Sequence, residues 1–351
     1  MVRKVRQIRP APRQTLVERL DALRRVRRDL VTVANAEWFS LFRDEIRNSI
    51  AIEGVFANRN DLLNVLERHK KTDRQKTAAI LGYFEAASTL YEYANNQRKE
   101  GEFELRISDI KQIHTLLMRY EKEIGVYTGD LGEFRRGDVE VAHATFRPIK
   151  APYIRPSMEL LVKWANRALF RAKDPADMIR AAAAAHVWFE TIHPFRDGNG
   201  RSGRILLSYM LMGCGLVNIA IKGITKTDRD RYYRSLEEAD SLFEGLHQRI
   251  ERSRRVSLGE AAGGIARADF KLLGTIIQER LDDSVERLAR GGFGDVGMKA
   301  DAVVPLRDAA MNFGFSQDYL RNLINRGGLK AHKRGKLWYV RLRDLQNYTG
   351  R

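Results

Sequence analysis

Cysteine is nearly absent from this chain, which contains only Cys214 among its 351 residues. An internal disulfide is therefore excluded, and the position of the thiol in the apolar run 206–217 predicts a buried residue in a reducing compartment. No apolar run approaches the ~20 residues that a membrane-spanning helix needs. The basic start, residues 1–6, is not followed by the apolar segment of a secretory signal. We expect a cytoplasmic protein with no membrane partner.

Acidic residues are also scarce relative to basic ones. The chain has 45 Asp and Glu against 62 Lys and Arg, which gives a formal net charge of +17. Residues 1–28 hold ten basic and two acidic residues (+8), and residues 299–351 hold eleven and four (+7), so the middle is nearly neutral. Basic ends suit a polyanionic partner such as nucleic acid. A solvated basic surface without a partner is the alternative.

The sequence is rich in helical periodicity, and 44% of its residues are hydrophobic, which suffices for a sizeable core and for two or more modules. The apolar spacing predicts helices over 14–36, 36–51, 61–67, 75–96, 157–170, 175–191 and 201–214, one after Ser108 as N-cap, and more between 251 and 290. Glycines and prolines punctuate 125–155, where the alternation in 139–146 predicts a short strand or hairpin. A glycine cluster at 291–297 predicts a linker.

One run carries the chemistry: His193-Pro-Phe-Arg-Asp-Gly-Asn-Gly-Arg-Ser-Gly-Arg204. Gly198 and Gly200 flank Asn199 directly before the apolar helix 201–214. A glycine-rich turn at a helix N-terminus presents backbone N–H groups and the positive end of the dipole, so it forms an anion cradle. Arg201 and Arg204 lie three residues apart on one face of the first turn. Two cations at a helix N-terminus indicate a polyanion between them.

Two further residues of the run complete a site for chemistry on a nucleotide phosphate. Asp197 beside a phosphate cradle is suited to Mg²⁺, which uses one or two carboxylates together with phosphate oxygens. His193 can accept a proton near neutral pH. Taken alone, a histidine is more often structural, and Asp-Gly-Asn-Gly is usually a plain turn. The combination of twelve residues is what indicates a site.

The run resembles, position by position, the signature of the Fic family, His-Pro-Phe-x-Asp/Glu-Gly-Asn-Gly-Arg-x-x-Arg, and differs from the Doc branch. The resemblance covers about residues 36–250. It implies a mainly α-helical fold with a small β-hairpin flap, and transfer of AMP from ATP, with Mg²⁺, to a Ser, Thr or Tyr hydroxyl of a target protein. By this resemblance His193 is the general base, Phe195 anchors the loop, Asp197 holds Mg²⁺, Gly198, Asn199 and Gly200 line the phosphates, and Arg201 and Arg204 contact the triphosphate.

The same resemblance assigns two nucleotide-binding segments outside the motif. The flap is expected upstream, over residues 132–143, where the target's backbone is clamped as an added strand. Val139, Glu140, Val141 and Ala142 would line its nucleotide side. Downstream, Tyr232 and Asp240 would meet the adenine. The alternatives are an ordinary surface hairpin for the flap and plain packing for Tyr232 and Asp240.

Far upstream, Ser49 and Glu53 lie four residues apart, so they share one face of a helix that Gly54 can end. The segment 49–54 resembles the inhibitory signature Ser/Thr-x-x-x-Glu-Gly/Asn of the Fic class with an N-terminal inhibitory helix. The resemblance implies that Glu53 pairs with Arg204, takes the place of the γ-phosphate and restrains transfer. A plain structural helix end is the alternative.

The last fifty residues resemble the winged helix-turn-helix of excisionase-like and MerR-like regulators. A first helix is expected from Pro305, a turn capped by Ser316, a second helix over 317–326 and a basic hairpin as wing. The candidates for contact with duplex DNA are Gln317, Arg321 and Asn325 on the helix, and Lys333, Arg334 and Lys336 on the wing. A protein-binding winged helix with an incidental basic face is the alternative.

These observations predict four parts: an N-terminal helical region (1–105), a catalytic core (106–250), a helical connector with its linker (251–298) and the winged unit (299–351). The predicted function is protein adenylyl transfer restrained by Glu53. Two alternatives stay open: another nucleotide or phosphate transfer, including removal of AMP, and a DNA-bound regulator that only senses nucleotide. The sequence is also compatible with a homodimer.

Overall fold

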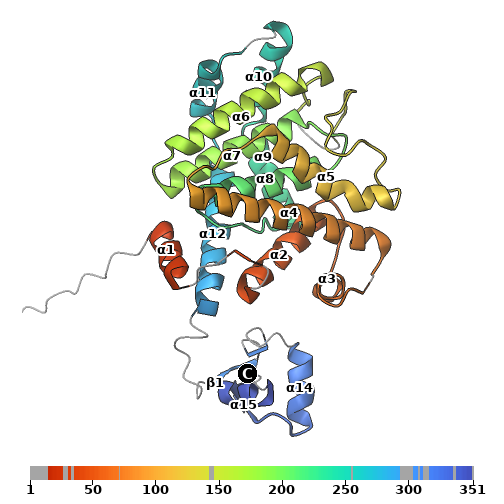
Figure 1. Cartoon of the computed structure of the whole chain (residues 1–351), viewed down its shortest axis with the longest axis vertical. Coiled ribbons are helices and arrows are strands. Elements are labelled where there is room, and N and C mark those ends of the chain that lie inside the picture. Colours follow the sequence, from red (N-terminus) through yellow and green to blue (C-terminus); the bar gives the residue numbers. More distant parts are fainter. Residues whose placement is uncertain are drawn as a thin grey trace, which may run out of the picture. The chain divides into compact units, whose positions relative to one another are not determined.

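The structure is a computed structural model that describes residues 15–349, apart from 27–30, 33–34, 71, 142–145, 254–255, 293–302, 307–308, 311–315 and 335–336. It is mainly helical, as the sequence predicts (Figure 1). The chain divides into two compact units, Met1–Val285 and Glu286–Arg351. Within the described residues, no helix is both long and apolar enough to cross a membrane.

The first unit is built of helices that follow the apolar periodicity. They are α1 (Leu16–Val26), α2 (Ala36–Ile52), α3 (Arg59–Leu66), α4 (Arg74–Glu100), α5 (Ile107–Glu123), α6 (Ile154–Arg171), α7 (Pro175–Ile192), α8 (Asn199–Gly213), α9 (Lys226–Glu237), α10 (Asp240–Ser253), α11 (Leu258–Arg267) and α12 (Lys271–Gly292), with a 3-10 turn, η1 (Ala151–Tyr153), before α6. Helix α12 continues past Val285, where the first unit ends, to Gly292. It therefore includes the first two glycines of the expected linker, whose remainder lies outside the described residues.

One predicted helix end and one predicted N-cap are wrong. The stretch 14–36 is not one helix, since α1 ends at Val26, whereas α2 begins at Ala36 as predicted, with Asn35 as its N-cap. The Asn35 side-chain oxygen accepts the N–H groups of Glu37 and Trp38, each at 3.1 Å. Helix α5 begins at Ile107, before Ser108, and the Asp109 carboxylate reaches back to the Arg106 N–H at 2.9 Å.

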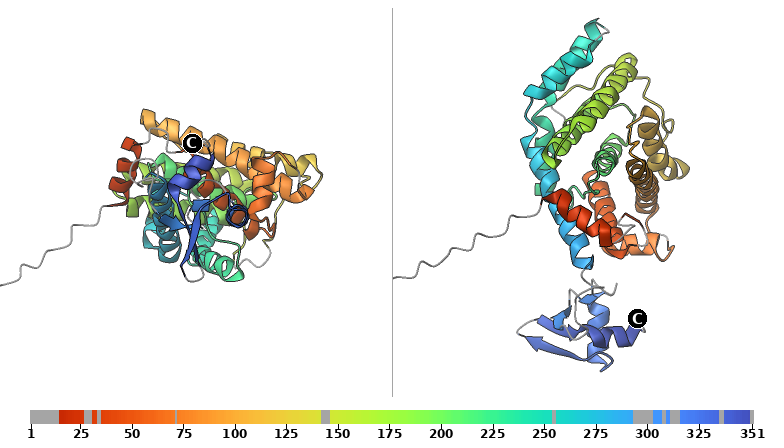
Figure 2. Two further views of the ribbon diagram at one scale, coloured as in Figure 1. Left: turned by 90° about the horizontal axis from the view of Figure 1, so that it is seen from below. Right: turned by 60° about the vertical axis from the view of Figure 1, so that its left-hand side comes forward.

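Helix α8 lies at the centre of the first unit and packs against α4, α5 and α7 (Figure 2). All of its residues except Gly200 are buried. The run Ala181–Ala185 of α7 is buried too, and such small side chains let helix backbones approach closely. Cys214, directly after α8, is half-buried rather than fully buried, and burial raises the pKa of its thiol to about 12. The motif is therefore the short connection between two buried helices.

The second unit contains a small antiparallel sheet and helices around one core. The strands β1 (Val303–Pro305), β2 (Ala331–Arg334) and β3 (Leu337–Arg341) pair in the order β1-β3-β2, and α14 (Gln317–Asn325) and α15 (Leu342–Thr349) accompany them. Ser316 caps α14 as predicted, because its hydroxyl accepts the Tyr319 N–H at 3.0 Å. The buried core is formed by Leu306, Ala309, Ala310, Leu320, Leu329, Val340 and Leu345. Pro305 ends β1, which pairs with β3 up to that residue, and Leu306, Ala309 and Ala310 directly after it are helical, where the first helix is expected.

Candidate active site

The motif connection is bounded by two residues in the left-handed backbone region. His193 caps the end of α7 with φ 51° and ψ 60°, and Gly198 stands before α8 with φ 76°. A histidine in this region is uncommon and is strained unless its surroundings hold it there. A Cβ at position 198 would also lie 2.6 Å from the sulfur of Met118, so this position favours glycine.

Side-chain hydrogen bonds and ring stacking hold the loop between these two residues. The side chain of Asn199 bonds the backbone of Phe195 twice, accepting its N–H at 2.8 Å and donating to its carbonyl at 2.9 Å. The buried Phe195 ring stacks on His114 at 3.9 Å. His114 accepts the Gly132 N–H on Nδ1 at 2.9 Å, which leaves Nε2–H to donate to the Asp197 carbonyl at 3.1 Å. The Asn199 side chain thus faces the loop backbone, so only its backbone N–H remains for a phosphate.

Arg135 joins the flap segment to the motif. Its buried guanidinium donates to the carbonyls of His193 at 2.9 Å, of Gly137 at 2.8 Å and of Ile149, and its backbone N–H donates to Pro194 at 2.9 Å. No described residue of 125–155 is in a strand, and residues 142–145 of the expected strand 139–146 lie outside the described part of the chain.

The four flap residues are only partly described. Val139 and Val141 are half-buried and Glu140 is exposed, while Ala142 lies outside the described residues. Because Arg135 fixes Gly137, the chain directly before them is tied to the motif loop. The chain that leads into Val139 is therefore tied to the backbone of His193 through Arg135, and the role of the flap residues stays a prediction.

His193 is a half-buried imidazole that is neutral at physiological pH. Its Nδ1 lies 3.3 Å from the backbone carbonyl of Glu190, and burial lowers the pKa of His193 to about 4. With Nδ1–H directed at that carbonyl, Nε2 keeps its lone pair. The residue can therefore accept a proton, as a general base must.

Arg201 is occupied by a partner that sequence reasoning missed. It forms an ion pair with Glu121 of α5 through both carboxylate oxygens, and Nη2 lies 3.1 Å from Oε2. Both residues are buried. A buried, two-pronged pair of this kind fixes α5 to the first turn of α8. In this structure the Arg201 guanidinium faces Glu121 instead of the phosphate side.

Arg204 forms hydrogen bonds with residues at the C-terminal end of α2. Its Nε donates to the Ser49 hydroxyl at 2.8 Å, and Nη2 donates to the Ser49 carbonyl at 3.1 Å and to Oε1 of Glu53 at 2.6 Å. The Arg204 side chain is 4% exposed and that of Glu53 is 36% exposed. Gly54 follows with φ 83°, in the left-handed conformation that ends α2. The contact expected from the segment 49–54 is present.

The Glu53 carboxylate lies on the anion cradle itself. A Cβ built on Gly200 would be 2.5 Å from Oε1 of Glu53 and 3.1 Å from Nη1 of Arg204. The carboxylate therefore rests against the first turn of α8, where backbone N–H groups and the helix dipole favour an anion. Glu53 thus occupies the position in which the sequence predicts a phosphate group.

Asp197 is an exposed carboxylate at the edge of this cradle, and its Oδ1 accepts the Gly198 N–H at 2.5 Å. Among the described residues, no group of three or more His, Cys, Asp or Glu is arranged to hold a metal ion. A magnesium ion that arrives with a nucleotide needs only one or two protein carboxylates, because phosphate oxygens and water supply the other ligands. A single carboxylate beside the cradle fits that requirement.

Tyr232 and Asp240, the expected adenine contacts, are both buried. The Tyr232 hydroxyl lies 2.8 Å from Nε2 of His186, whose Nδ1 is 3.0 Å from the Gly203 carbonyl. The guanidinium of Arg204 lies 5.8 Å from the centre of the Tyr232 ring. Asp240 begins α10. For Tyr232 these contacts favour the packing alternative, because its ring supports Arg204 from inside the fold.

The candidate DNA contacts of the second unit are distributed over α14 and the β2–β3 hairpin. Gln317 is half-buried, and Arg321 and Asn325 are exposed. Arg321 pairs with Asp318 one turn earlier at 3.1 Å. Lys333 is exposed, with its ammonium 5.7 Å from the centre of the Trp338 ring. Arg334 ends β2, and Lys336 lies outside the described residues.

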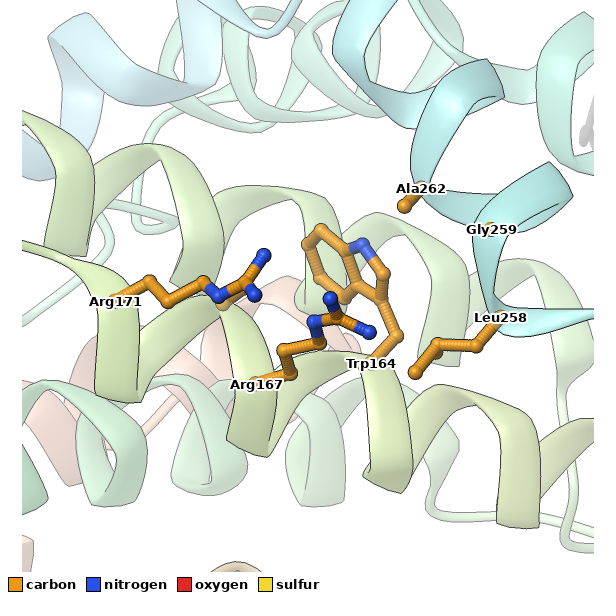
Figure 3. A pocket seen from close by; sticks show the side chains of 7 residues that line it. Trp164, Arg167, Arg171, Leu258, Gly259 and Ala262 are labelled. Atoms are coloured by element: carbon orange, nitrogen blue, oxygen red, sulfur yellow. The ribbon is translucent and has the colours of Figure 1, made fainter.

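An apolar cavity of about 180 Å³ lies elsewhere in the first unit, between α6 and α11. Figure 3 shows Trp164, Arg167 and Arg171 of α6 facing Leu258 and Ala262 of α11. Its lining contains no histidine or carboxylate and no residue of the motif. It therefore provides neither a base nor a metal ligand, and it is not the site of the chemistry.

The supporting residues that sequence reasoning missed are His114, Glu121, Arg135 and Glu190. The first three lie between 58 and 83 residues along the chain from their partners in the motif. Glu190 is close to the motif in sequence but lies on the buried face of α7. The one available signal was a polar residue within the apolar face of a predicted helix. Glu121 and His114, for example, share the buried face of α5 with Leu117.

Comparison with known proteins agrees with this geometry. Residues 104–211 match the Fic/DOC family. The chain is 27% identical over 286 residues to a probable protein adenylyltransferase of Aquifex aeolicus (strain VF5), and the match covers 81% of both chains. It is 31% identical over 137 residues to the protein adenylyltransferase fic-1 of Caenorhabditis briggsae, which is 39% of this chain and 24% of the relative. The chain thus spans about a quarter of that animal protein.

Solved structures show the same fold. A Fic domain-containing signaling protein from Bacteroides thetaiotaomicron matches with a TM-score of 0.54 at 19% identity, over 78% of this chain and 97% of that one. Fic-1 from Caenorhabditis elegans matches with a TM-score of 0.52 at 19% identity, over 78% and 72%. The motif 193–204 lies within the residues 104–211 that match the Fic/DOC family.

Proposed function

We propose that the chain is a protein adenylyltransferase, which moves AMP from ATP to a hydroxyl group of a target protein. One observation carries the proposal: a neutral His193 lies at one end of the loop whose other end forms the anion cradle and leads to Arg204. The relatives are named as protein adenylyltransferases. Their reaction needs a general base and a binding site for phosphates, which His193 and the anion cradle with Arg204 would supply.

The reaction follows from the positions of these groups. Nε2 of His193 takes the proton of the target hydroxyl while its oxygen attacks the α-phosphorus of ATP. The bond from the α-phosphorus to the bridging oxygen breaks, and pyrophosphate leaves with that electron pair. The N–H groups of the cradle and Arg204 hold the phosphates in line, which supplies most of the catalysis in such transfers. Asp197 would hold Mg²⁺, which neutralises phosphate charge when bound.

The target is a protein that offers a serine, threonine or tyrosine hydroxyl. Its backbone lies along the flap residues 139–142 as an added strand. Support comes from the tie between Arg135 and the His193 carbonyl, because a peptide held by this segment brings its hydroxyl toward the base.

Glu53 restrains the reaction. Its carboxylate takes the guanidinium that the γ-phosphate needs and adds negative charge on the cradle, so ATP is kept from the in-line position. The test is intact-mass spectrometry of the wild type and of Glu53→Gly after incubation with ATP and Mg²⁺. Addition of one AMP mass to the variant, or to a target in a lysate, is expected. Absence of any AMP adduct from both proteins and from the lysate would contradict the proposal.

The second unit acts as a DNA-binding winged helix. Residues 299–351 carry a net charge of +7, and Arg321, Asn325 and Lys333 are exposed on α14 and on the β2–β3 hairpin. In this arrangement α14 reads the major groove and the hairpin contacts phosphates. Binding of duplex DNA by the full chain tests this part.

A further inference from the structure

Glu190 is a buried carboxyl group behind the motif that the reaction above does not use. It lies on α7, three residues before His193, and is 8% exposed. Its Oε1 has no hydrogen-bond partner among the described residues. A Cβ built on Gly203 would overlap this oxygen, so the carboxyl group presses on α8 directly before Arg204.

The charged and titratable groups around Glu190 come from three other helices. Arg204 of α8 attracts its negative charge, and Glu53 of α2 repels it. Tyr232 and Tyr233 of α9 also interact electrostatically with Glu190. Arg204 therefore has two carboxyl groups within electrostatic reach: Glu53 in direct contact, and Glu190 against the neighbouring residue Gly203.

A buried guanidinium and two carboxylates cannot all be charged without cost. An arginine side chain stays protonated in proteins, and burying that of Arg204 without a counter-charge is unfavourable. One carboxylate balances it, and a second leaves an excess negative charge in the interior, which protonation removes. Burial raises the pKa of Glu190 to about 8, with Arg204 lowering it and Glu53 raising it. With Glu53 on Arg204, Glu190 is therefore the neutral partner at pH 7.

We propose that Glu190 is a stand-by counter-ion that positions Arg204. It holds a proton while Glu53, or a bound phosphate, faces Arg204, and it ionises when neither does. Departure of Glu53 then releases one proton from Glu190 to solvent, and the resulting carboxylate keeps Arg204 in place. Entry of a triphosphate reverses this step, because the carboxylate takes one proton back from solvent. The step with phosphate rests on the proposed function, whereas the step with Glu53 does not.

The first experiment needs no nucleotide. Infrared spectra at pH 7 are recorded for the wild type, Glu190→Gln, Glu53→Gly and the double variant. The difference between wild type and Glu190→Gln should show one protonated carboxyl band, and the difference between Glu53→Gly and the double variant should show none. Glu45, whose burial raises its pKa to about 7, is present in all four proteins and cancels. The same band in both differences would overturn the inference, whatever the enzyme transfers.

The second experiment counts protons on binding of ATP with Mg²⁺. Titration calorimetry of Glu53→Gly in buffers of different ionisation enthalpy gives the number of protons taken up. We expect up to one more proton in Glu53→Gly than in the Glu53→Gly/Glu190→Gln variant. Equal counts would also overturn the inference. Failure of both proteins to bind ATP would contradict the proposed function, and the infrared result would still decide the role of Glu190.

Thermal unfolding separates this role from plain packing. Glutamine mimics a protonated carboxyl, so Glu190→Gln alone should leave the Tm close to that of the wild type. In the Glu53→Gly background the same change leaves Arg204 without either counter-charge. The double variant should therefore lose more Tm than the two single shifts add up to. Additive shifts would contradict a shared counter-charge.

Discussion

Glu53 and Arg204 are separated by 151 residues in the sequence, yet Oε1 of the glutamate lies 2.6 Å from Nη2 of the arginine. The same carboxylate rests on Gly200, in the first turn of α8. One side chain therefore both neutralises the arginine of the site and covers the anion cradle beside it.

Glu53→Gly should raise transfer of AMP by about a hundredfold or more, because misplacement of the reacting phosphate costs on the order of that factor. The variant frees Arg204 and leaves His193, Asp197 and the cradle intact. Glycine is tolerated at position 53, which is the C-cap of α2. The measurement is incorporation from α-labelled ATP. Arg204→Ala in the same background should lose most of the gain. Equal incorporation by wild type and variant, both with ATP bound, would make the segment 49–54 a structural helix end.

His193→Ala in the Glu53→Gly background should lower transfer by about 10²–10⁴-fold, the usual contribution of a general base. ATP affinity should remain, because the cradle and Arg204 do not depend on the imidazole. Titration calorimetry with ATP checks the affinity and label incorporation checks the rate. Undiminished transfer would remove His193 from its assigned role.

Glu121→Gln should destabilise the first unit by about 3–5 kcal/mol, because it leaves the buried Arg201 without its counter-charge. The matched control is Glu133→Gln, which breaks an ion pair with Lys111 of 3.0 Å at the surface and should cost less than about 1 kcal/mol. Urea unfolding measures both. A loss at Glu121 as small as that at Glu133 would show that the buried pair contributes little to stability.

The full chain should bind duplex DNA with an affinity that falls steeply as salt rises, because phosphate contacts release counter-ions. Lys333→Ala should lower the slope of log affinity against log salt by about 1, as expected for one phosphate contact. Lys226→Ala is the control, since its ammonium is exposed on α9 of the first unit. Filter binding at several salt concentrations gives the slopes. Absence of binding at low salt would favour the protein-binding alternative.

His247 should make the fold sensitive to acid. It is buried in α10, neither ring nitrogen has a partner among the described residues, and burial lowers its pKa to about 3. Its neutral form is favoured in the folded state, so its contribution is complete above the unfolded pKa of about 6.5 and is lost as pH falls toward 3.

Between pH 8 and pH 5, His247→Leu should therefore lose about 2 kcal/mol less stability than the wild type, since 1.5 pH units lie below the unfolded pKa. Urea unfolding at the two pH values gives this difference. Equal losses in both proteins would mean that His247 is protonated in the folded state.

The helices and the chemical loop could be predicted because their signals are local. Apolar residues at helical spacing marked α2, α4, α7 and α8 within a few residues. The turn, the anion cradle and the base of the motif all lie within residues 193–204, so they could be recognised from the sequence. The start of α5 at Ile107, with Arg106 as N-cap, escaped prediction, because the nearby Ser108 could also have served as the cap.

The strand expected over 139–146 stays a prediction, because residues 142–145 lie outside the described part of the chain. Arg135 donates to the carbonyls of Gly137 and Ile149 on either side of that stretch. A strand signal says which residues can pair, and the packing around them decides whether they do.

The sequence by itself determined the helical class, the motif with its base and anion cradle, and, through the spacing of Ser49 and Glu53, a face that can reach an arginine. Only the tertiary structure decided that Glu121 takes Arg201, that Arg135 holds the loop and that Glu190 lies against Gly203, the residue before Arg204. The physical reason is the separation along the chain over which each interaction acts. Helix periodicity and turn chemistry act within a few residues, whereas the charge that a buried arginine needs can come from any helix that packs against it.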